Sequence, residues 1–162
     1  MEWNEVKTLE VKGKILTFKD AMIMLDEDET KPDWPSISCV PGEYIFEINV
    51  PKPFFAHRAR IKKIDTDPIL GIEIGTVDID HAFLGIIDYE SFIKEVKKDY
   101  EGYSDWTAME LDDELCNNFS GEIELNDEKL LYVQAGDGDG TYTCYELIQD
   151  DHQVGIECVF IP

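Results

Sequence analysis

The sequence predicts a mainly β fold of the α+β class: an antiparallel β-sandwich or open barrel with one or two helices on one side. Short apolar segments that alternate with polar residues recur along the chain and are separated by turn residues. One stretch near the middle changes to the spacing of an amphipathic helix. No linker-like or low-complexity segment interrupts the 162 residues, so we expect a single domain over residues 1–162.

The first half of the chain is predicted to consist of strands joined by turns. Ala21–Leu25 is a continuous apolar run, which favours a buried strand. The bases Arg58, Arg60 and Lys62 alternate with apolar residues, so they should line one exposed face of a strand. Further strands are predicted at 6–11, 14–18, 44–50, 69–79 and 83–87.

The change to helical spacing comes after Asp88, a residue suited to cap the N-terminus of a helix. Apolar residues between Tyr89 and Tyr100 fall on one helical face, and Gly102 is expected to end this helix. A second, shorter helix is predicted between Ser104 and Cys116. Its expected apolar anchors are Met109, Leu111 and Leu115.

The last part of the chain returns to strands, with one hairpin predicted over 121–133 and another over 141–161. Between them, Gly136–Gly140 alternates glycine with aspartate, a pattern that could supply carboxylates to calcium. The positions where an EF-hand loop would need its later ligands are Thr141 and Ile148, however. A glycine-rich turn explains the spacing, and we predict neither a metal nor a cofactor.

Other residues with catalytic or metal-binding chemistry do not form a recognisable pattern. Asp78, Asp80 and His81 offer ligand atoms, but on a strand His81 would point away from the two carboxylates. No Ser or Cys occurs with a His in a known nucleophile motif. We therefore predict that the protein is not an enzyme.

Composition narrows the class of protein further. No run of about 18 apolar residues occurs, so no membrane-spanning helix is expected. The acidic N-terminus lacks the pattern of a secretory signal. The four cysteines are widely spaced, which disfavours a zinc site and predicts reduced thiols in a cytoplasmic protein.

The charge of the chain is large and uneven. The net charge is −22, and residues 64–162 hold 25 acidic side chains but only four bases. Such a field repels nucleic acid and anionic membranes and attracts a basic protein partner. Acidity also keeps a cytoplasmic protein soluble, so charge alone leaves the choice between these roles open.

The stretch from Asp105 to Glu114 differs from a plain run of charge because Trp106 and Met109 lie among its carboxylates. Binding hot spots combine a desolvated apolar centre with surrounding charges. The alternative is a helix with Trp106 and Met109 in the core and its acids in solvent. The predicted partner-binding residues are Asp105, Trp106, Glu110, Asp112, Asp113, Glu114, Asp137, Asp139, Asp150 and Asp151.

Five segments at turns and strand ends are informative when they are considered together. These segments are Val40–Tyr44, Ala59–Ile61, Val77–Asp80, Phe83–Asp88 and Gly136–Tyr142. Together they resemble a family of uncharacterised bacterial β-rich proteins, whose members are often found among proteins similar to toxin-immunity proteins. The resemblance implies a β-rich fold and an immunity role, and it carries over no catalytic residue.

Our first expectation for the function is an immunity-type protein that neutralises a basic toxin, such as a nuclease, through an acidic surface. The alternative is a small-ligand or calcium-binding module, and a hydrolase of unknown type is the third hypothesis. Nucleic acid and membranes are not expected as partners. The sequence leaves the oligomeric state and the identity of the toxin open.

Overall fold

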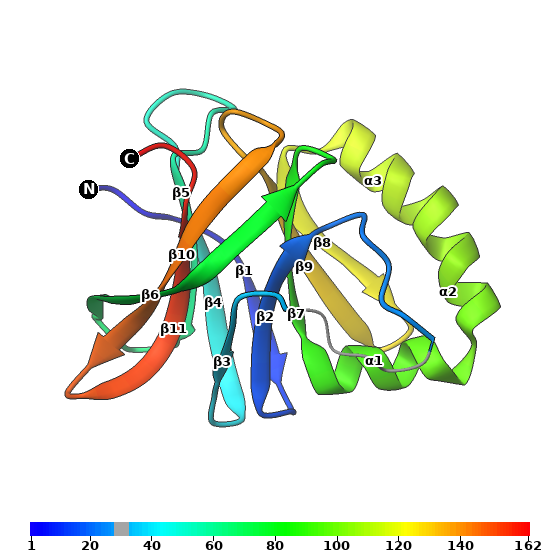
Figure 1. Cartoon of the computed structure of the whole chain (residues 1–162), viewed down its shortest axis with the longest axis horizontal. Helices are drawn as coiled ribbons and strands as arrows, with labels where there is room; N and C mark the ends of the chain where they lie inside the picture. The colour runs from blue at the N-terminus through cyan, green and yellow to red at the C-terminus, as the bar shows by residue number, and fades with distance from the viewer. Residues whose placement is uncertain (28–32) are drawn as a thin grey trace.

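The computed structural model describes residues 1–27 and 33–162, which form two antiparallel β-sheets and a helical layer (Figure 1). The first sheet has the strand order β1-β4-β5-β11-β10-β6, and the second has the order β3-β2-β7-β9-β8. The strands are β1 (Asn4–Val11), β2 (Ile15–Asp20), β3 (Ser36–Ser38), β4 (Gly42–Asn49), β5 (Arg58–Lys63), β6 (Ile69–Ile79), β7 (Phe83–Asp88), β8 (Ser120–Leu125), β9 (Glu128–Gln134), β10 (Gly140–Gln149) and β11 (His152–Val159). The predicted mainly β, sandwich-like fold is confirmed.

The space between the two sheets is filled by apolar and aromatic side chains. Alternation along β4 turns Tyr44 and Phe46 inward, and alternation along β7 does the same for Leu84 and Ile86. Each fully buried side chain of this kind contributes about 1.5–3 kcal/mol through the hydrophobic effect. We call this cluster the sandwich core, because it holds the two sheets together.

The helical layer covers the outer face of the second sheet. It consists of α1 (Tyr89–Lys98), α2 (Tyr100–Trp106), the π-helical turn η1 (Thr107–Leu111) and α3 (Asp112–Asn117). Phe92 and Trp106 of this layer pack with Tyr132 of β9 in a second cluster, which we call the helix-side core. The prediction of helices on one side of the sandwich is confirmed. Among the described residues, no helix is both long and apolar enough to cross a membrane.

The predicted strand at Ala21–Leu25 is wrong. β2 ends at Asp20, whose Oδ1 accepts a hydrogen bond from the backbone N–H of Met22 at 2.9 Å and so starts a turn. Ala21 and Leu25 are nevertheless buried, because the loop turns their side chains into the helix-side core. The apolar run therefore did not determine the backbone conformation, and only its first and last residues are buried.

β2 also buries a lysine on the face opposite the sandwich core. Lys19 is 1% exposed, and its Nζ donates to the carbonyl oxygens of Asp20 at 2.7 Å and Ala21 at 3.2 Å. The ammonium group lies 5.5 Å from the centre of the Trp34 ring. Burial lowers the pKa of Lys19 to about 7, because the charged form loses its hydration.

The bases of β5 share one face of their strand, as predicted, but this face is only partly exposed, since Arg58 and Arg60 are largely covered by their neighbours. Arg58 pairs with Glu157 at 2.8 Å, and Arg60 pairs with Glu47 at 2.8 Å and stacks on the Trp3 ring at 4.1 Å. These contacts lie on the face of the first sheet that points away from the sandwich core. The two arginines are thus neutralised by their neighbours.

Candidate protein-binding surface

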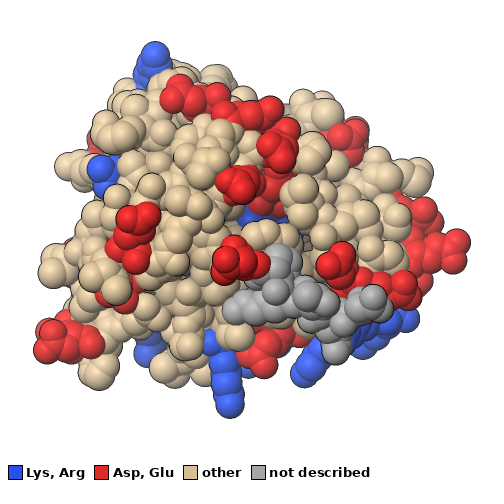
Figure 2. Space-filling view, in the orientation of Figure 1, with Lys and Arg blue, Asp and Glu red and all other residues tan. Residues whose placement is uncertain are grey.

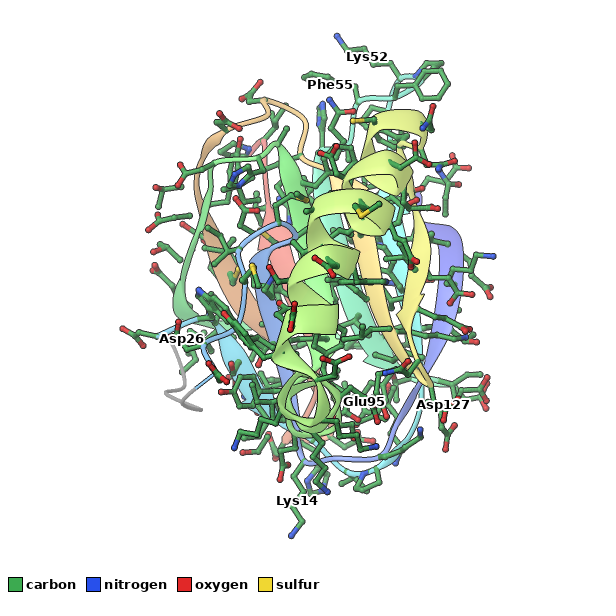
Figure 3. The ribbon with its side chains drawn as sticks, turned by 90° about the vertical axis from the view of Figure 1, so that its right-hand side faces the viewer. Lys14, Asp26, Lys52, Phe55, Glu95 and Asp127 are labelled. Carbon is green, nitrogen blue, oxygen red and sulfur yellow. The ribbon has the colours of Figure 1, made fainter. Side chains whose placement is uncertain are left out.

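α2, η1 and α3 follow one another without a break over residues 100–117, which we call the helical arm (Figures 1 and 3). α1 ends because Asp99 leaves the helical region of the backbone, with a φ of −157°. Asp99 then caps the arm, since its Oδ1 accepts a hydrogen bond from Gly102 N at 3.0 Å. Gly102 was predicted to end the first helix, and this is wrong. It lies inside α2, where a Cβ would come within 2.2 Å of Asp99 Oδ2.

The inner side of the arm is a buried stripe with a spacing of four residues: Tyr103, Thr107, Leu111 and Leu115. On an α-helix of 3.6 residues per turn, this spacing drifts around the helix axis. The π-helical turn at Thr107–Leu111 contains one more residue than an α-helical turn and corrects the drift. The stripe therefore stays on the second sheet along the whole arm.

Trp106 belongs to this inner side. Its ring stacks on Tyr103 with 6.1 Å between centroids, and its Nε1 donates to the carbonyl oxygen of Glu124 at 2.9 Å. Burial raises the pKa of Tyr103 to about 12, and its hydroxyl accepts a hydrogen bond from Leu25 N. Trp106, predicted as a partner contact, is thus an internal residue whose indole is not offered to a partner.

The outer side of the arm carries carboxylates around an exposed methionine. Met109 is 69% exposed, which corrects its predicted place among the apolar anchors. Residues 99–128 contain eleven Asp and Glu and no Lys or Arg. In Figure 2, acidic side chains gather at the right-hand edge, where the arm lies. The exposed carboxylates of the predicted set on the arm are Asp105, Glu110, Asp112 and Asp113.

Glu114 differs from these four residues because it is partly buried. The hydroxyl of Tyr132 donates to Glu114 Oε2, and so does the side-chain amide of Asn118 at 3.2 Å. Burial, together with the neighbouring carboxylate, raises the pKa of Tyr132 well above its usual value. Glu114 therefore fastens the arm to β9.

Between the arm and the β6–β7 turn lies an apolar pocket of about 290 Å³. Its lining residues are Met22, His81, Phe83, Asp112, Leu115 and Cys116. A hollow of this size accepts about one large side chain rather than an extended ligand. An apolar hollow beside several carboxylates is the arrangement expected at the centre of a protein interface.

His81 is held in the pocket wall by a buried carboxylate. Asp20 is 1% exposed, and its Oδ2 accepts hydrogen bonds from Asp80 N at 2.7 Å and His81 N at 3.0 Å. The same oxygen lies 3.0 Å from His81 Nδ1, which fixes the orientation of the ring. Asp78 and Asp80, which were expected to point away from this histidine, are not its partners, and the carboxylate that orients it comes from a residue 61 positions away.

Asp137 and Asp139 lie in the β9–β10 loop beside the same turn. Asp139 Oδ1 accepts a hydrogen bond from Ala82 N at 2.9 Å, which ties the loop to the turn that carries His81. Asp137 is exposed. Within residues 1–27 and 33–162, no group of three or more His, Cys, Asp or Glu side chains is placed to hold a metal ion. The calcium alternative thus gains no support from this loop.

Asp150 and Asp151 lie apart from the arm. They form the two-residue turn between β10 and β11, with φ values of 52° and 63° that suit the tight turn of a twisted hairpin. Figure 1 shows this turn at the lower left and the arm at the right. Asp150 borders another groove, of about 470 Å³, together with Tyr44 and Lys63. The structure does not bring these two aspartates to the arm surface.

Bases gather at the lower end of the helical layer. They line a pocket of about 340 Å³ between the β1–β2 turn and α1. Lys12 is paired there with Glu128 at 3.3 Å. Figure 3 labels Lys14 and Glu95 at this end, below the arm. The lysines of the pocket are Lys12, Lys14, Lys94 and Lys98.

The surface that results combines the outer side of the arm with the apolar pocket. Sequence reasoning found the carboxylates but missed the pocket, whose walls come from separate segments of the chain. The only sequence signal for it was the apolar run that contains Met22. The residues missed are Met22, His81, Phe83 and Cys116. The chain matches no family model, no curated protein and no solved structure.

Proposed function

We propose that this chain is a bacterial, cytoplasmic immunity-type protein that neutralises a basic toxin by binding it with the helical arm. One observation carries the proposal: the outer side of the arm bears exposed carboxylates without a base, and an apolar pocket adjoins it. Carboxylates accelerate the encounter with a cationic surface, while the pocket supplies the desolvated centre that holds the complex. The protein acts by binding and not by catalysis.

A nuclease is the kind of toxin that this surface fits best. The groove of a nuclease is lined with Lys and Arg that neutralise phosphates. The carboxylates Asp105, Glu110, Asp112 and Asp113 would compete for the same bases. Occupation of the pocket next to Asp112 by one apolar toxin side chain would set the orientation of the complex.

The test compares two fourfold charge variants. The arm variant carries Asp105→Asn, Glu110→Gln, Asp112→Asn and Asp113→Asn. The control variant carries Glu2→Gln, Glu5→Gln, Glu10→Gln and Glu43→Gln, which remove the same charge from exposed positions in and next to β1 and β4. The toxin is captured from the native strain with the tagged wild-type chain and then purified for kinetic measurements.

We expect the arm variant to associate about tenfold or more slowly than the wild type and to lose protection of cells that express the toxin. The association rate of the wild type should fall between about 0.05 and 0.3 M salt, because salt screens the carboxylates. The control variant should match the wild type in both respects. Equal effects of the two variants, or a rate that ignores salt, would show that the arm is not the binding surface.

The groove beside the β10–β11 turn supports a second candidate function, the binding of a small ligand. Its volume of about 470 Å³ lies in the range of ligand sites, and Tyr44, Lys63 and His152 offer polar contacts. A ligand that binds the native state must raise the melting temperature. A metabolite screen by thermal melting tests this function, with Val154→Trp as the variant that fills the groove and should abolish any shift.

A further inference from the structure

β6 is the outermost strand of the first sheet, and among the described strands only β10 pairs with it. Its outer edge therefore carries backbone N–H and C=O groups without a neighbouring strand. The first part of β6 also exposes large apolar side chains: Ile69 is 72% exposed, Leu70 44% and Ile72 69%. Exposed apolar residues on an open edge mark a site where another strand can pair.

The opposite edge of the same sheet lacks this combination. Along β1, Glu5, Lys7 and Glu10 are exposed, whereas the apolar residues Leu9 and Val11 are buried. Charged side chains on an edge strand prevent pairing with other chains. The apolar surface of β6 is thus a local feature and not a general property of the sheet.

β6 has an open half and a covered half, which meet near two irregularities in its pairing with β10. The register shifts between Leu70 and Glu73 and again between Glu73 and Gly75, so one β-bulge lies within the open half and the other at its end. Beyond them, Gly75 and its neighbours border a small pocket with Trp34 and Pro35. The open half is therefore Ile69–Glu73.

The charge around this half indicates its occupant. Residues 64–80 and 136–153, which contain β6 and β10, hold ten Asp and Glu and no Lys or Arg. Figure 2 shows carboxylates separated by uncharged surface on the face that these strands cross. A second copy of this acidic chain would meet like charge, whereas a basic strand would meet opposite charge.

We propose that the β6 edge at Ile69–Glu73 binds an extended basic segment of another protein, which adds to the first sheet as an antiparallel strand. Backbone hydrogen bonds hold the segment, as in other cases of strand addition. Its apolar side chains cover Ile69 and Ile72, and its bases meet Asp67 and Glu73. This site lies on β6 and not on the arm, so it does not depend on the function proposed above.

The probe for this site is a synthetic peptide of about eight residues in which Lys and Val alternate. Two peptides serve as controls: one in which Glu replaces Lys, and one in which alternate backbone amides of the Lys–Val peptide are N-methylated. Backbone amide signals of the ¹⁵N-labelled protein are followed by NMR during titration. Ile72→Lys disables the edge, and Met109→Lys is its matched control, because Met109 is also 69% exposed.

We expect the Lys–Val peptide to shift the amide signals of Ile69–Glu73 and the two control peptides to leave them in place. Ile72→Lys should weaken binding at least tenfold, and Ile69→Lys should do the same, while Met109→Lys should have no effect. If the N-methylated peptide bound as tightly as the Lys–Val peptide, the contact would be unspecific charge attraction and not strand addition. Signals that shift only on the arm, or a dimer of this chain that Ile72→Lys dissolves, would also overturn the proposal.

Discussion

The two cores of the molecule are built differently, although they share the second sheet. The sandwich core is lined by residues such as Phe46 and Ile61, whose side chains are fully buried and apolar. The helix-side core contains groups that need a polar partner, among them the Lys19 ammonium and the Tyr103 and Tyr132 hydroxyls. The tyrosines of the sandwich core, Tyr44 and Tyr142, donate only to backbone carbonyls four residues away. In the helix-side core, the hydroxyls of Tyr103 and Tyr132 instead join segments that are distant in the sequence.

This difference indicates that the two cores have different roles. An apolar core resists change because each cavity costs free energy, so it suits a framework. In a core with polar contacts, each hydrogen bond makes a small contribution of its own to the free energy of unfolding. Such contacts can therefore be altered one at a time. The helical arm, which carries the proposed binding surface, is attached through the second kind of core.

The largest expected effect is on the sandwich core. Phe46→Ala should lower the free energy of unfolding by about 3–5 kcal/mol, because the rigid packing around it cannot collapse into the cavity. The matched substitution Phe92→Ala, in the helix-side core, should cost less, since the helices can move toward the sheet. Urea unfolding followed by circular dichroism measures both. Equal losses would remove the distinction between the two cores.

Lys19→Met should raise the free energy of unfolding at neutral pH by roughly 1–3 kcal/mol, because it removes a charge from an apolar site. The pKa of Lys19 is about 7 in the folded chain, below its ordinary value of 10.5. Between these values the unfolded chain binds more protons, so the wild type gains stability as the pH rises. The advantage of Lys19→Met should therefore shrink from about pH 7 to about pH 10.

Urea unfolding across this pH range measures the difference between the two proteins. Lys94→Met, at an exposed position, is the control and should show no comparable dependence on pH. A difference between wild type and Lys19→Met that stays constant with pH would contradict the burial of this ammonium.

Tyr132→Phe should cost about 1–2 kcal/mol, because it removes the hydroxyl that donates to Glu114. Since this contact joins the arm to β9, the loss should be local. Hydrogen exchange should accelerate in α3 and remain unchanged in β4 and β5. Tyr142→Phe, which breaks a hydrogen bond between β10 and the β9–β10 loop, is the control and should leave α3 protected.

The smallest perturbation is a chemical label. All four cysteines are free, and Cys116 is exposed beside the apolar pocket, whereas Cys144 and Cys158 are fully buried. A thiol reagent should modify Cys116 first. Cys39 should react slowly, because burial and nearby carboxylates raise its pKa to about 11. Rapid labelling of Cys144 or Cys158 in the native protein would show that the sandwich core is not closed.

Alternation of apolar and polar residues predicted most strands, because successive side chains of a strand point to opposite faces of the sheet. It failed at Ala21–Leu25, a loop that buries only the first and last of its five apolar residues. The carboxylates of the arm were found from composition, but the exchange of roles between Trp106 and Met109 was not. That exchange depends on how the arm packs on the second sheet, which no local propensity marks. The Asp20–His81 contact was also out of reach, because it depends on the tertiary arrangement of β2 and the β6–β7 turn.

The π-helical turn also determines which sequence changes the arm tolerates. Because this turn holds one residue more than an α-helical turn, deletion of one residue between Trp106 and Leu111 can be absorbed by a return to α-helical winding. Deletion of one residue between Leu111 and Glu114 would instead rotate every later side chain by about 100°. Leu115 would then leave the sheet, and Glu114 would lose Tyr132. Exchange of the outward residues Asp105, Met109 or Glu110 has no such consequence. During divergence, the length of the arm after Leu111 is therefore constrained, while the chemistry of its outer surface is free to change.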